Sequence, residues 1–118
     1  MRILGALHPP LACAATQNNL GAAYSDLPVG DRGENLKKAI ECYEAALRVR
    51  TETDFPQAWA NTMCNLGLAW WDLADHSGDR QLLGTARDCF LNAARGYRAV
   101  GNEDEARDAE RQADRCEP

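Results

Sequence analysis

The chain has 118 residues, of which 45% are hydrophobic and 26% are charged, and this balance is typical of a folded domain and not of a disordered tail. Its net charge of -5 disfavours a nucleic-acid-binding protein, which would neutralise phosphates with basic side chains. Residues 1–10 lack the apolar core of a signal peptide, and the apolar runs are far shorter than the about 20 residues that span a bilayer. We therefore expect a cytoplasmic protein without nucleic-acid or membrane partners.

The first predicted helix covers residues 10–27. Leu20, Tyr24 and Leu27 recur at helical spacing among small alanine residues. Pro10 suits the first helical turn, because its missing N–H group would be unpaired there in any case. Residues 28–31, with the sequence Pro-Val-Gly-Asp, are expected to end this helix.

A second helix is predicted immediately after this turn. Asp31 and Glu34 have the spacing of a capping box, in which each side chain bonds to the backbone N–H of the other. An apolar stripe with helical period follows, with lysine and glutamate residues on the opposite face. The stripe consists of Leu36, Ala39, Ile40, Tyr43, Ala46 and Leu47.

The chain contains an internal duplication. Residues 10–27 align without gaps with residues 56–73, and more than half of the aligned residues are identical, where chance would give about one match. The identical pairs are Pro10/Pro56, Ala12/Ala58, Ala14/Ala60, Thr16/Thr62, Asn19/Asn65, Leu20/Leu66, Gly21/Gly67, Ala23/Ala69, Asp26/Asp72 and Leu27/Leu73. The following helices correspond through Leu36/Leu83, Ala39/Ala86, Cys42/Cys89, Tyr43/Phe90 and Ala46/Ala93, and the turns through Gly-Asp-Arg at 30–32 and 78–80.

The duplication predicts two helix pairs, one in residues 10–52 and one in residues 53–100. Asp54 is expected to cap the first helix of the second pair. In residues 101–118 a capping box at Asn102 and Glu105 precedes a narrow stripe of small residues, which is typical of a terminal capping helix. Alternation with period two is absent, so we predict an all-α fold of about five helices and no strand.

These units resemble the tetratricopeptide repeat. The resemblance lies in Leu-Gly-x-x-aromatic at residues 20–24 and 66–70, and in Ala-x3-aromatic-x2-Ala at residues 39–46 and 86–93. It implies a right-handed α-solenoid of antiparallel helix pairs, in which Gly21 and Gly67 allow close helix approach. The distance between equivalent residues exceeds the roughly 34 residues usual in the family, which is similar to the long-linker repeats of bacterial signalling proteins.

Two features of the ends bear on this solenoid. Residues 1–3 resemble residues 47–49, so residues 1–9 are an N-terminal extension or the remnant of an earlier repeat. Near the C-terminus a second frame beginning at Arg87 also fits a tetratricopeptide unit, with residues 79–100 as its first helix. The two frames differ in which face of helix 79–100 lines the groove.

The resemblance implies a non-catalytic protein-interaction module that holds a peptide or a partner helix in the groove lined by the first helices. An asparagine before Leu-Gly suits this task, because its amide offers both a donor and an acceptor to a peptide group. The predicted groove residues are Asn18, Asn19, Ala22, Asp26, Asn61, Asn65, Leu68 and Asp72. The alternative interpretation is that these residues form the solvated side of an amphipathic helix.

Other functional hypotheses have less support in the sequence. Enzyme motifs are absent, no cofactor or metal site is expected, and the Gly-Asp-Arg segments are interpreted as turns. A structural piece that dimerises through its exposed end helix is the main alternative, and a ligand site at Cys64, Asp72 and His76 is a weaker one. Trp71 is expected either in the groove or under the last helices.

Overall fold

A computed structural model of the protein describes residues 10–116, and the predicted extension or remnant at residues 1–9 lies outside them. The described residues form α-helices and no strand, as predicted. The helices are α2 (Pro10–Asp26), α3 (Arg32–Leu47), α4 (Pro56–Ser77), α5 (Leu82–Ala99) and α6 (Glu103–Asp114).

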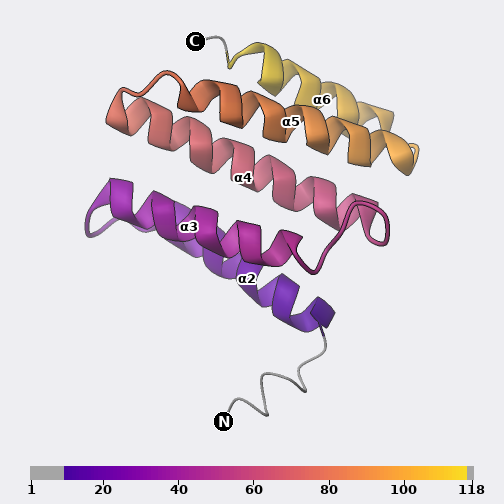
Figure 1. Cartoon of the computed structure of the whole chain (residues 1–118), viewed down its shortest axis with the longest axis horizontal. Helices are drawn as coiled ribbons and strands as arrows, with labels where there is room; N and C mark the ends of the chain where they lie inside the picture. The colour runs from indigo at the N-terminus through magenta and orange to yellow at the C-terminus, as the bar shows by residue number, and fades with distance from the viewer. Residues whose placement is uncertain (1–9, 117–118) are drawn as a thin grey trace.

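Each helix packs against the next one in the chain, from α2 to α6, and α2 also touches α4. Figure 1 shows α3, α4, α5 and α6 one beside the other in chain order, with α2 partly behind α3 at the end opposite α6. The order follows from the short connections, which return each helix beside its predecessor. The predicted contact of the last helix with the one before it is therefore present.

Both Gly-Asp-Arg segments form turns, as predicted. Gly30 and Gly78 have φ values of 83° and 77°, a left-handed conformation that favours glycine. Asp31 is the N-cap of α3, and its carboxylate accepts a hydrogen bond from the backbone N–H of Glu34 over 3.0 Å. In the second turn, the Asp79 carboxylate accepts from the backbone N–H of Gln81.

The other two predicted caps have different outcomes. Asn102 caps α6, since its side chain accepts from the backbone N–H of Glu105. The prediction for Asp54 is wrong, because the N-cap of α4 is Phe55, which makes no side-chain hydrogen bond. Asp54 instead belongs to the preceding turn, where its backbone N–H donates to the Thr51 hydroxyl.

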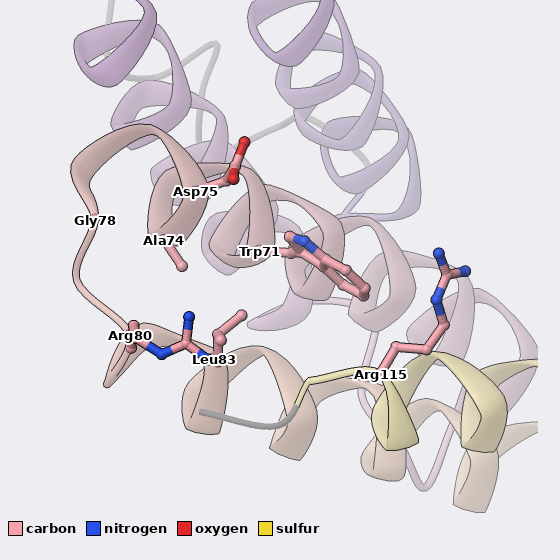
Figure 2. A pocket seen from close by; sticks show the side chains of 7 residues that line it. All are labelled: Trp71, Ala74, Asp75, Gly78, Arg80, Leu83 and Arg115. Carbon is pink, nitrogen blue, oxygen red and sulfur yellow. The ribbon is translucent and has the colours of Figure 1, made fainter.

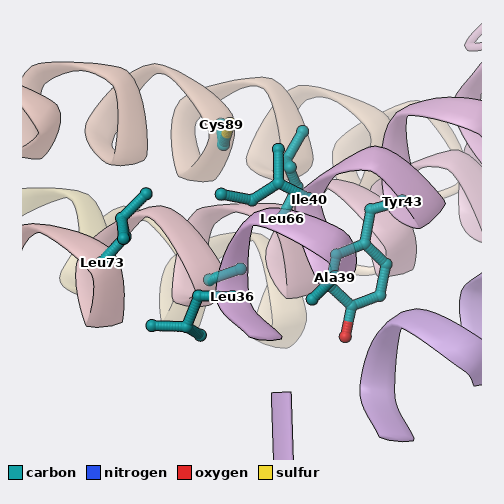
Figure 3. Packing of buried hydrophobic residues seen from close by; sticks show 8 residues of the cluster. Leu36, Ala39, Ile40, Tyr43, Leu66, Leu73 and Cys89 are labelled. Carbon is teal, nitrogen blue, oxygen red and sulfur yellow. The ribbon is translucent and has the colours of Figure 1, made fainter. Parts of the chain in front are cut away.

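The core follows the apolar stripes of α3, α4 and α5. Its first cluster joins α3 to α4 and reaches α5 through Cys89, and it comprises Leu36, Ala39, Ile40, Tyr43, Leu66, Ala69, Leu73 and Cys89 (Figure 3). Two further clusters join α4 and α5 to α6, where small residues such as Ala106, Ala109 and Ala113 are buried. The small side chains allow α6 to lie close to α5 while its charged face meets water.

The duplicated glycines face the duplicated aromatic residues. A Cβ atom on Gly21 would lie 2.6 Å from the Tyr43 ring, and one on Gly67 would lie 3.0 Å from the Phe90 ring. Both distances are shorter than ordinary van der Waals contact, so only glycine allows the two helices of each pair to approach this closely. The same contact thus occurs once in each copy of the duplicated unit.

None of the described helices combines the length and the apolar character needed to cross a lipid bilayer.

Candidate functional site

A pocket of about 230 Å³ opens between α2 and α4, the first helices of the two predicted units. It is lined by Ala22, Ser25, Asp26, Tyr43, Asn65, Leu68, Ala69 and Asp72. We call this pocket the α2–α4 groove. Its lining combines carboxylates, an amide, a hydroxyl and apolar surface.

Helical spacing explains how these side chains converge. Ala22, Ser25 and Asp26 are three or four residues apart and therefore lie on one face of α2. Asn65, Leu68 and Asp72 lie in the same way on one face of α4. The two faces meet across the groove because α2 touches α4.

A small polar network joins α2 to α4 beside the groove. The Asn18 carbonyl oxygen Oδ1 accepts hydrogen bonds from the Thr62 hydroxyl and from Asn65 Nδ2, each over 3.2 Å. Thr62 is fully buried, so this bond satisfies a hydroxyl that water cannot reach. Because Asn65 donates its Nδ2 to Asn18, its carbonyl oxygen remains the acceptor that can meet a backbone N–H of a ligand.

Two carboxylates give the α2–α4 groove its charge. Burial raises the pKa of Asp72, the Arg32 guanidinium opposes this rise, and the carboxylates of Asp75 and Asp26 add to it. Arg32 Nη2 lies 3.4 Å from the Asp72 carboxylate, and Arg32 also donates to the backbone carbonyl of Ser25. Arg32 thus connects the end of α2 with α4, and Asp26 and Asp72 leave the groove acidic.

The structure brings most of the predicted groove residues together. Ala22, Asp26, Asn65, Leu68 and Asp72 line the groove, and Asn18 supports it through its bond to Asn65. The two remaining predicted residues lie elsewhere. The sequence reasoning did not include Ser25, Tyr43 and Ala69, although Ser25 follows Ala22 by three residues, a spacing that places both on one helical face.

Asn19 and Asn61 lie outside the α2–α4 groove. Asn19 is exposed on α2, and it is the neighbouring Asn18 that turns toward α4. Asn61 accepts a hydrogen bond of 2.6 Å from the hydroxyl of Tyr97 on α5. It also lines a separate shallow depression formed with Phe55 and Val100.

A larger cavity of about 380 Å³ lies between the end of α4, the start of α5 and the end of α6 (Figure 2). Trp71 forms part of its wall, and the Arg115 guanidinium lies 5.4 Å from the centre of a Trp71 ring. Trp71 therefore lies beside the last helices and outside the α2–α4 groove. Asp75 and Arg80 also line this cavity, so its charges are mixed.

The described thiols are part of the packing. Cys42, Cys64, Cys89 and Cys116 are free, and burial is the largest cause of the raised pKa of each, which reaches about 12 for Cys89. These thiols therefore stay protonated near neutral pH and are poor nucleophiles.

The structure does not bring Cys64, Asp72 and His76 together into the ligand site of the weaker hypothesis. Cys64 Sγ lies 3.8 Å from the Tyr97 hydroxyl, whereas Asp72 bonds to Arg32. His76 lies against Gly33 at the end of α4. Within residues that the structure describes, no group of three or more His, Cys, Asp or Glu side chains is arranged to hold a metal ion.

Searches with models of known families, with curated proteins and with solved structures give no match to this chain.

Proposed function

We propose that this protein is a non-catalytic interaction module that binds an extended peptide or a partner helix in the α2–α4 groove. The observation that carries the proposal is the convergence of Asp26 on α2 with Asn65, Leu68 and Asp72 on α4 around one pocket. Carboxylates, an amide and an exposed leucine are the groups that bind a charged side chain, a peptide backbone and an apolar side chain, respectively.

We further propose that the helices form a short right-handed solenoid of the tetratricopeptide type. The support is the recurrence of one packing contact, Gly21 against Tyr43 and Gly67 against Phe90, at equivalent positions of the duplication. The arrangement of the helices also agrees with a solenoid, since α2 and α4 border the same groove and α3 packs against both of them. In such a stack the first helices line the binding surface.

The charge of the groove favours a basic partner. Asp26 and Asp72 line the same pocket, and the Asp26 carboxylate makes the smallest contribution to the raised pKa of Asp72, after burial and Asp75 and against the lowering by Arg32. A lysine or arginine side chain placed between them would relieve this repulsion, and Leu68 beside them would cover the aliphatic part of that side chain. We therefore expect a peptide that carries a basic residue.

A peptide selection tests this function. Twelve-residue random peptides displayed on phage and selected on the immobilised protein should become enriched in lysine and arginine. Fluorescence anisotropy with a selected peptide should show roughly three- to tenfold weaker binding to Asp72→Asn, since the variant loses one charge at the groove.

The control for this experiment is Asp104→Asn, which removes the same charge from an exposed position on α6. It should bind the peptide as the wild type does. Equal losses in the two variants would mean that net charge alone attracts the peptide, and selection of peptides without basic residues would contradict the proposal.

Acidification should weaken peptide binding at a higher pH than an ordinary aspartate would cause. The pKa of Asp72 is raised, so its carboxylate becomes neutral on acidification before an exposed aspartate does. The protonated form no longer attracts a cation, and the affinity should fall as the pH drops through this pKa. Titrations of the selected peptide between pH 7 and pH 4 should show a shallower decrease for Asp72→Asn.

A further inference from the structure

The exposed face of α2 repeats a face of α4 that is largely buried. Thr16, Asn19, Leu20, Ala23, Asp26 and Leu27 are identical to Thr62, Asn65, Leu66, Ala69, Asp72 and Leu73, respectively. These are the residues through which α4 contacts the first helix pair. The contacts in α4 therefore specify what the copy on α2 can bind.

In α4 all six residues have partners in the first helix pair. Thr62 and Asn65 bond to Asn18, and Asp72 bonds to Arg32 at the start of α3. The three apolar residues, Leu66, Ala69 and Leu73, pack in the first core cluster against Leu36, Ala39, Ile40 and Tyr43 of α3. The contact thus combines an apolar seam, a buried amide network and an ion pair.

All six equivalent residues, five in α2 and Leu27 directly after it, are exposed. The exposed fraction is 43% for Leu20 against 5% for Leu66, and Leu27 and Leu73 differ in the same way. The described helices that contact α2 are α3 and α4, and Asp26 lies where this face borders the α2–α4 groove. Within residues 10–116, no helix covers Leu20, Ala23 and Leu27, which are the copies of the apolar residues that pack against α3.

We propose that this face docks a helix of another protein that has the chemistry of α3. Such a helix carries aliphatic and aromatic residues at the spacing of Leu36, Ile40 and Tyr43, and an arginine in its first turn at the position of Arg32. The arginine pairs with Asp26, as Arg32 pairs with Asp72. The apolar residues cover Leu20 and Leu27.

Charge decides between this partner and a second copy of the chain. A pair of α2 faces would bring no further cation to Asp26, because α2 contains no lysine or arginine and Arg32 beside its end already bonds to the Ser25 carbonyl and to Asp72. The far end of the molecule offers no match either, since the exposed residues of α6 include Asp104, Arg107, Asp108 and Arg111. The matching face of α3 is already buried against α4 in each copy. Charge therefore favours an α3-like helix of another protein over a second copy of this chain.

A synthetic peptide of residues 31–48 is a suitable probe, because it contains α3 with its capping residue Asp31. Labelled with a fluorophore, it should bind the intact chain in a 1:1 complex by anisotropy. Leu20→Asp should weaken this binding at least tenfold, because it places a carboxylate in the apolar seam. Leu91→Asp is the matched control, since Leu91 is 40% exposed on α5, and it should leave the affinity unchanged.

Charge exchange tests the orientation of the docked helix. A peptide with Arg32→Glu should bind the wild-type chain more weakly and should regain affinity for Asp26→Arg. Absence of peptide binding, or equal losses in Leu20→Asp and Leu91→Asp, would overturn the proposal. If Leu20→Asp did not weaken binding, the peptide would have displaced α3 from α4 and would not lie on α2. If the chain formed dimers that depend on Leu20, the partner would be a second copy. Either result would contradict the proposal.

Discussion

Replacement of Phe90 by alanine should lower the free energy of unfolding by about 3–5 kcal/mol. Phe90 is 1% exposed, and its ring lies against Gly67 on α4. It also belongs to the cluster that includes Ala113 and Cys116 at the end of the chain's described part. Because these neighbours are small or belong to fixed helices, they cannot collapse into the space that the ring leaves.

The neighbouring residue provides the control for Phe90→Ala. Leu91 is exposed on the other side of α5, so Leu91→Ala should change the stability by less than about 0.5 kcal/mol. Urea unfolding followed by circular dichroism measures both variants against the wild type. Similar stabilities for the two variants would show that the contact of α5 with α4 contributes little to the fold.

The helices could be predicted because the pattern of turns and apolar stripes occurs twice in the sequence. A turn that begins at Gly30 recurs at Gly78, and Ala46 of the first apolar stripe recurs as Ala93 of the second, so each copy supports the assignment of the other. The cap of α4 could not be predicted as well. Asp54 has the right chemistry, but its position relative to Pro56 depends on the geometry of the loop, which the residue types alone do not determine.

The groove was predicted in part because equivalence in sequence is not equivalence in environment. Asn19 and Asn65 are identical in the duplication, yet Asn65 meets α2 whereas Asn19 faces away from α4. In a row of repeated units, equivalent side chains point in the same direction, and the unit at the edge has no neighbour on that side. Asn18 therefore supplies the contact from α2, and its role could be recognised only once α2 and α4 were placed beside each other.

Two glycines of α5 should respond in opposite ways to substitution by alanine. Alanine favours a helix more than glycine does, so a glycine without close neighbours gains stability from this change. A Cβ atom on Gly84 would meet no atom within 4 Å, and Gly84→Ala should stabilise the protein by about 0.5 kcal/mol. A Cβ atom on Gly96 would lie 2.9 Å from the Cβ of Ala60 and 3.0 Å from the backbone oxygen of Pro56.

Gly96→Ala should therefore destabilise the protein by about 1–3 kcal/mol in spite of the better helix propensity, because a backbone carbonyl cannot move away as a flexible side chain can. Thermal unfolding of the two variants should move the midpoint down for Gly96→Ala and slightly up for Gly84→Ala. If both variants were stabilised, α4 and α5 would lie farther apart at Gly96 than the contact distances indicate. Since Gly96 faces the start of α4, that result would also mean that Trp59 and Ala60 pack differently against α5.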